Sequence, residues 1–192
     1  SALVAAGALD FGEAFRLVHE RARVTSEDVP EGAMAAVLGL EPSAIEAVLP
    51  EGAQVANYNG PGQTIISGTL PALDAAEQVL KEAGAKRVMR LNVSGPFHSE
   101  HMRQARDLFR AFLQSAALKT PETRFISSVS GRDEHDPERI RGLLGDQICA
   151  PVRWTDVMAV IGPVEALETG PGRVLQGLAK RTEAAPVVTP AG

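Results

Sequence analysis

The sequence lacks several features that would assign it to particular classes of protein. Its 192 residues include one cysteine, Cys149, so no internal disulfide framework is available. Lysine and arginine form no long cluster and the net charge is −5, which argues against nucleic-acid binding. The longest apolar stretch, residues 2–9, is too short to span a bilayer and follows no charged signal-peptide region. We expect a cytoplasmic protein that binds neither nucleic acid nor membrane.

The apolar residues, 44% of the sequence, alternate between helix-like and strand-like periods, which is typical of α/β structure. Residues 33–93 have the order strand, helix, strand, strand, helix, strand, which predicts a ferredoxin-like (βαββαβ) subdomain. Residues 1–32 and 94–192 predict an α/β-hydrolase-like core with a parallel sheet, into which that subdomain is inserted. Because the first residue is Ser1 and not methionine, we expect the chain to open inside a longer protein and this core to lack its N-terminal part.

Two helix starts bear on the candidate site. The run Asp10-Phe11-Gly12-Glu13 resembles a capping box, and Ser99 is predicted to cap a later helix. The apolar face of the first helix is expected to comprise Phe11, Ala14, Phe15, Val18 and Ala22. The buried stripe of the second is expected to comprise Met102, Ala105, Phe109, Phe112 and Ala116.

His98 is the histidine whose position suggests chemistry. It lies between a predicted strand and a predicted helix, at an edge where α/β proteins place functional groups. A lone histidine at such a point is still more often structural. His101 is three residues away, but no cysteine or clear carboxylate joins the pair at ligand spacing, so no metal site is predicted. His19 and His135 are expected to be solvated.

Arg21 is the second candidate, because Ala14 and Val18 share its side of the first helix. A guanidinium on a largely apolar face is costly unless an anion meets it. The alternative is an arginine at a helix C-terminus, favoured by the macrodipole and extended toward solvent. Gly170-Pro171-Gly172 is weak evidence for a phosphate loop and sound evidence for a tight strand-to-helix turn. We interpret Cys149 as a small buried hydrophobe.

Seven stretches, in register and covering nearly the whole chain, resemble the malonyl-CoA:acyl carrier protein transacylases and, more broadly, the acyltransferase domains of fatty-acid and polyketide synthases. They are SALVAAGAL (Ser1–Leu9), RLVHERAR (Arg16–Arg23), GAMAAVLGL (Gly32–Leu40), NYNGPGQTIISG (Asn57–Gly68), AGAKRVMRLNVSGPFHSEHM (Ala83–Met102), DQICAPVRW (Asp146–Trp154) and ETGPGRVLQGL (Glu168–Leu178).

The resemblance implies a ping-pong transfer of malonyl from malonyl-CoA to the phosphopantetheine thiol of acyl carrier protein in fatty-acid biosynthesis. In the family, a serine in a G-H-S-x-G turn carries the acyl group and lies just before the segment that resembles residues 1–9. The sequence contains no G-x-S-x-G, so the resemblance implies that the nucleophile is absent and that this chain alone is inactive. No cofactor or metal is implied, because malonyl-CoA is a substrate and the phosphopantetheine belongs to the partner.

Five residues match functional positions of the family. His98 matches the catalytic histidine, and Gln147 matches the residue whose backbone carbonyl orients it. Arg21 matches the arginine that binds the malonyl carboxylate, which supplies the missing anion. Asn59 matches an asparagine lining the same pocket. Phe97 stands where phenylalanine accompanies malonyl use and serine accompanies methylmalonyl use, a difference of one methyl group.

Two alternatives stay open. One is a polyketide-type acyltransferase with another extender unit, against whose methylmalonyl version Phe97 argues. The other is a non-catalytic module that only docks a carrier protein. An acidic carrier would meet exposed cations, for which the candidates are Lys86, Arg87, Arg90, Lys180 and Arg181. Each of these charges, taken singly, is more simply explained as part of a solvated face.

Overall fold

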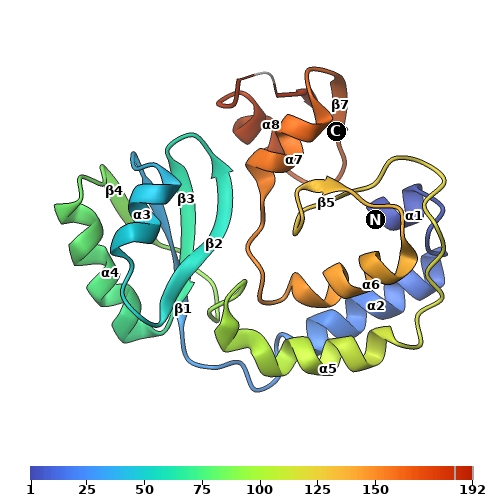
Figure 1. The fold of residues 1–192 in the computed structure, drawn as a ribbon, viewed down its shortest axis with the longest axis horizontal. Helices are drawn as coiled ribbons and strands as arrows, with labels where there is room; N and C mark the ends of the chain where they lie inside the picture. Colours follow the sequence, from blue (N-terminus) through green and yellow to red (C-terminus); the bar gives the residue numbers. More distant parts are fainter. Residues whose placement is uncertain (184, 192) are drawn as a thin grey trace.

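A computed structural model describes residues 1–183 and 185–191 of the chain. Figure 1 shows a sheet covered by two helices, α3 and α4, on one side of the molecule and a group of helices that includes α2, α5 and α6 on the other. The mixed α/β character predicted from the periodicities is confirmed. Among the described residues, no helix is both long and apolar enough to cross a membrane.

The four-stranded sheet has the topology predicted for residues 33–93. Its strands follow the order β2-β3-β1-β4, and every neighbouring pair is antiparallel. This arrangement corresponds to a ferredoxin-like βαββαβ unit. Its elements are β1 (Ala33–Leu38), α3 (Pro42–Val48), β2 (Ala53–Gly60), β3 (Gln63–Gly68), α4 (Leu70–Glu82) and β4 (Arg87–Arg90).

Side chains alternate along each strand, so every strand contributes to both faces of the sheet. Each face carries a buried apolar cluster. On β1, Ala35 and Val37 face α3 and α4, where they pack with Leu73 and Leu80. The opposite face carries a smaller cluster of Met34, Ala36, Ala56 and Ile65, against which Phe97 packs. The second face therefore rests on the chain segment that leads to His98.

The other main core lies among the long helices, and α2, α5 and α6 supply most of it. It contains Leu17, Phe109, Leu113 and Ile140, all buried. The stripe predicted for residues 102–116 is buried except for the half-buried Phe112. The elements are α1 (Ala2–Ala5), α2 (Phe11–Val24), the short 3-10 helix η1 (Glu100–Met102), α5 (Arg103–Leu113) and α6 (Pro137–Asp146).

The predicted apolar face of α2 is wrong for most of its residues, although Ala14 packs against the helical core. Phe11, Phe15 and Val18 are 76%, 66% and 63% exposed, whereas Leu17 and Val24 are buried. The helix carries two apolar stripes at helical spacing, and periodicity alone does not say which one packs. The packing of α2 on α5 selects the stripe that holds Leu17 and Val24. Arg21 occupies the same stripe, four residues after Leu17.

Parallel pairing among the described residues is limited. It joins β7 to β8, and an isolated parallel bridge joins Asn57 to Val152. β8 was not predicted, because it is a short, half-exposed strand that ends at a proline. The division into a core of residues 1–32 and 94–192 with an inserted subdomain stays a prediction. The remaining elements are β5 (Ile126–Ser127), β6 (Arg132–Asp133), α7 (Trp154–Ile161), β7 (Glu165–Glu168), α8 (Val174–Ala179) and β8 (Val187–Pro190).

Candidate active site

His98 lies in the turn between β4 and η1, as the sequence predicts. Its φ of 56° is left-handed, a conformation that residues other than glycine rarely adopt. Ser99 follows as the N-cap residue of η1, but its side chain does not cap the helix. Instead, the buried Ser99 hydroxyl donates a 2.5 Å hydrogen bond to the carbonyl of Pro96, which closes the turn on itself. The predicted capping role of the Ser99 side chain is therefore wrong.

The imidazole of His98 is held by the end of α6. Its Nδ1 lies 2.8 Å from the carbonyl oxygen of Gln147 and 3.2 Å from that of Ala150. A carbonyl oxygen only accepts hydrogen bonds, so Nδ1 must carry the proton and the lone pair must reside on Nε2. This is the tautomer that a general base requires, and two neutral carbonyls fix it without adding a charge.

Gln147 connects His98 to Arg21. The Nε of Arg21 donates a 3.0 Å hydrogen bond to the side-chain oxygen Oε1 of Gln147, whose backbone carbonyl accepts from His98. Burial lowers the pKa of Arg21, and its guanidinium still remains protonated. One residue therefore contacts a fixed cation through its side chain and the histidine through its backbone.

The electrostatics of His98 favour the neutral ring. Burial is the largest cause that lowers the pKa of His98, and the positive charge of Arg21 lowers it further. The carbonyls of Ala150 and Gln147 act in the opposite direction, because each stabilises a protonated ring. The net shift is downward, so the Nε2 lone pair remains available at neutral pH.

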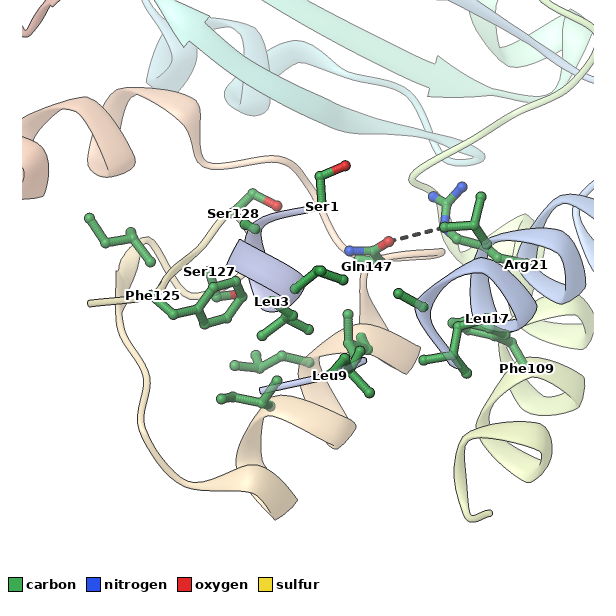
Figure 2. Close-up of a pocket in the computed structure, with 18 residues that line it drawn as sticks. Ser1, Leu3, Leu9, Leu17, Arg21, Phe109, Phe125, Ser127, Ser128 and Gln147 are labelled. Atoms are coloured by element: carbon green, nitrogen blue, oxygen red, sulfur yellow. Dashed lines mark hydrogen bonds between the residues drawn. The ribbon is translucent and has the colours of Figure 1, made fainter. Parts of the chain in front are cut away.

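A cavity of about 320 Å³ opens beside this group, and Figure 2 shows its lining. Most of the wall is apolar and comes from α1, α2, α5 and α6, including Leu3, Leu17 and Phe109. Arg21 and Gln147 contribute polar groups, and Figure 2 shows the hydrogen bond between them. His98 does not line this cavity.

Two of the predicted substrate-binding residues lie outside the cavity lining. Phe97 packs between the helical core and the smaller cluster on the sheet, and it is half-buried. Asn59 is half-buried on β2, next to Tyr58, whose backbone N–H donates to the carbonyl of Val152 at 2.9 Å. The structure therefore joins His98, Gln147 and Arg21 directly, and it places Phe97 and Asn59 on neighbouring segments.

The other sequence candidates have structural explanations. His101 contacts the carbonyl of Gly52 through Nε2 at 3.0 Å. Burial raises the pKa of Cys149 to about 11, which disfavours a reactive thiolate. Within the described ranges, no three His, Cys, Asp or Glu side chains gather as a metal site would require.

Gly170-Pro171-Gly172 forms the turn before α8, and the start of α8 is already occupied by an anion. The carboxylate of Glu168 accepts hydrogen bonds from the backbone N–H groups of Leu175 at 2.8 Å and Gln176 at 3.0 Å. A phosphate would have to displace this carboxylate from the helix N-terminus. The tight-turn interpretation therefore holds better than the phosphate-loop interpretation.

Two contacts of the site were not foreseen from the sequence. The carbonyl of Ala150 is a second acceptor for His98, and the side chain of Gln147 binds Arg21. Both contacts depend on how the chain turns after α6. A backbone carbonyl carries no signature in the sequence, because every residue has one.

The chain is similar to known proteins over most of its length. Residues 1–173 match the family described as "Acyl transferase domain". The chain is 41% identical to the malonyl CoA-acyl carrier protein transacylase of Bacillus subtilis (strain 168), over 94% of this chain and 61% of that protein. A solved acyl carrier protein S-malonyltransferase from Vibrio cholerae matches with a TM-score of 0.92 and 36% identity, over 99% of this chain and 65% of that one.

A further solved structure contains a type II polyketide acyl-carrier protein in complex with its malonyl-transacylase. It matches with a TM-score of 0.90 and 35% identity, over 98% of this chain and 64% of that one. The chain thus spans less than two thirds of the length of each of these relatives. Since the family match covers most of its residues, the chain belongs to the acyl transferase domain family.

Proposed function

We propose that the complete protein transfers a malonyl group from malonyl-CoA to the phosphopantetheine thiol of an acyl carrier protein. The observation that carries this proposal is the linked group of His98, Gln147 and Arg21. It combines a histidine in the tautomer of a general base with a cation able to bind a carboxylate. The names of the relatives support the same substrates.

In the proposed chemistry, Nε2 of His98 takes the proton of a serine hydroxyl as the serine oxygen attacks the thioester carbonyl. The carbon–sulfur bond breaks, the proton passes from His98 to the departing coenzyme A sulfur, and a malonyl-serine ester remains. The carrier thiol then attacks this ester, with His98 accepting the thiol proton and returning it to the serine oxygen. The family places that serine in a G-H-S-x-G turn, which this sequence does not contain.

Arg21 is proposed to bind the free carboxylate of the malonyl group. Its Nε is engaged by Gln147, which leaves the two Nη atoms for a bidentate pair with a carboxylate. Phe97 and Asn59 are proposed to shape the acyl site from the turn before His98 and from β2. The change of acyl preference in Arg21→Ala, discussed below, tests the assignment of Arg21.

The carrier is proposed to approach exposed basic side chains. The five basic side chains named as candidates are all exposed: Lys86, Arg87, Arg90, Lys180 and Arg181. Arg90 pairs with Asp74, and Arg181 donates to Gln63 at 2.8 Å, so these two charges are partly engaged within the chain. An acidic carrier would be attracted by the remaining positive charge, mainly through a faster association rate.

The 192-residue chain by itself is expected to form no covalent malonyl adduct, because it contains no G-x-S-x-G nucleophile. Incubation with radiolabelled malonyl-CoA followed by mass spectrometry of the denatured protein measures this directly. The complete protein, treated in parallel, provides the positive control. A stoichiometric adduct on any serine of the chain would contradict the proposed division of roles.

As the pH is lowered, kcat/KM is expected to fall with an apparent pKa below the ordinary histidine value of about 6.5. This fall is the acid limb of the pH profile. Burial and the charge of Arg21 lower the pKa of His98, so the neutral base persists to lower pH. Because kcat/KM reports the free enzyme, a pH profile of transfer by the complete protein measures this pKa. Arg21→Gln removes one lowering influence and should move the acid limb upward. An acid limb at or above 6.5 in the unaltered protein would contradict the assignment.

A further inference from the structure

The backbone of His98 needs support that its ring contacts do not provide. Its φ of 56° is unfavourable for a side chain with a Cβ atom. Such conformations persist only where the surrounding structure holds them. The carbonyls of Gln147 and Ala150 bind the ring, but these two contacts do not restrain the backbone of His98 itself.

Gln54 on β2 contacts the backbone on both sides of Ser99. Its side-chain oxygen Oε1 accepts a 2.9 Å hydrogen bond from the backbone N–H of Glu100. Its Nε2 lies 3.4 Å from the carbonyl oxygen of His98, to which it donates. A single amide group therefore bridges the residue that bears the imidazole and the first residue of η1.

Two further observations show that the backbone near Gln54 is itself held in place. Gln54 is paired in register with the buried Ser67 of β3, so the middle of the sheet anchors its backbone. The carbonyl of Gly52, two residues before Gln54, accepts from Nε2 of His101 at 3.0 Å. Gln54 on β2 therefore contacts the turn at His98, and Gly52, just before β2, contacts His101.

We infer that Gln54 is a positioning residue for His98, which fixes the left-handed backbone from the sheet while the end of α6 fixes the ring. A primary amide suits this role because it donates and accepts in one plane. The inference rests on the proposed role of His98 as general base. Gln54 lies outside the residues that line the cavity, so it is expected to affect the proton-transfer step and not malonyl binding.

The direct test measures the His98 ring itself in the complete protein. Gln54→Met keeps the length of the side chain and removes both hydrogen bonds. The ring ¹⁵N and ¹³C signals of His98, assigned by their loss in His98→Ala, are expected to move in Gln54→Met. The signals of His19 and His135 should stay in place. Gln78→Met is the matched control, because Gln78 is an exposed glutamine on α4 whose side chain donates to Glu82 on the same helix.

Malonyl transfer supplies the second readout. Gln54→Met is expected to lower kcat by about ten-fold with KM for malonyl-CoA unchanged, since small misplacement of a catalytic group is costly. Gln54→Glu keeps the acceptor for Glu100 but places a carboxylate oxygen against the carbonyl oxygen of His98, so its kcat should fall at least as far as that of Gln54→Met. If Gln54→Met does not fold, a lower kcat with unchanged KM for malonyl-CoA in Gln54→Glu supports the inference on its own.

The two proposals fail in different ways. Unchanged His98 ring signals in both Gln54 variants would overturn the positioning role, whatever happens to transfer. Unchanged kcat in both would do the same. Absence of malonyl transfer by the unaltered complete protein would instead overturn the proposed function, and full transfer by His98→Ala would remove His98 from the mechanism, while the ring signals would still report whether Gln54 positions the imidazole.

Discussion

His98→Ala in the complete protein is expected to lower the rate of malonyl transfer by about 10²–10⁴-fold, the usual contribution of a general acid–base group. The reason is geometric, because Nδ1 is committed to the carbonyls of Gln147 and Ala150 and only Nε2 is free to exchange a proton. Single-turnover transfer of labelled malonyl measures this effect. Both acylation and transfer to the carrier should slow, since His98 is proposed to act in each half-reaction.

The control for this variant is His19→Ala. His19 is exposed on α2, the same helix that carries Arg21, so its loss tests whether a missing histidine disturbs the fold near the site. Transfer by His19→Ala should equal that of the unaltered protein. Near-normal turnover by His98→Ala would remove His98 from the mechanism.

Arg21→Ala is expected to change which acyl group the protein prefers. A charge-assisted hydrogen bond contributes about 1.5–3 kcal/mol, so kcat/KM for malonyl-CoA should fall roughly ten- to hundred-fold. Uncharged acyl-CoA substrates have no carboxylate to pair with Arg21, so their rates in Arg21→Ala should equal or exceed those of the unaltered protein. Competition between malonyl-CoA and acetyl-CoA in one reaction gives the selectivity directly.

Arg16→Ala is the matched control for Arg21. Arg16 lies on the same helix, but its side chain is 58% exposed and pairs with Glu13. Its removal should leave the malonyl preference intact. Unchanged selectivity in Arg21→Ala would instead favour the alternative in which Arg21 is simply an arginine near a helix C-terminus.

Local signals in the sequence predicted local structure well. The order of strands and helices expected for residues 33–93 is found in β1 to β4 with α3 and α4, and the Asp10 side chain accepts a hydrogen bond from the N–H of Glu13, as the predicted capping run requires. These features depend on a few neighbouring residues. The orientation of α2 depends on what packs against it, and the sequence contains two apolar stripes that fit a helix equally well.

The contacts of the site span long separations along the chain. Arg21 and Gln147 are 126 residues apart, and His98 and Ala150 are 52 apart. The resemblance to a family indicated Arg21, His98 and Gln147, because each occupies a recognisable stretch. It gave no indication of Gln54, since its contacts with the backbone of residues 98 and 100 arise only when β2 packs beside that turn.

The bond between Arg21 and Gln147 also has a consequence for the entropy of substrate binding. A free arginine side chain samples many rotamers, and ordering such a side chain on binding typically costs about 0.5–1.5 kcal/mol. Here the Nε bond orients the guanidinium plane before any acyl group arrives. That ordering is completed when the protein folds, so a carboxylate meets a cation that is already aligned.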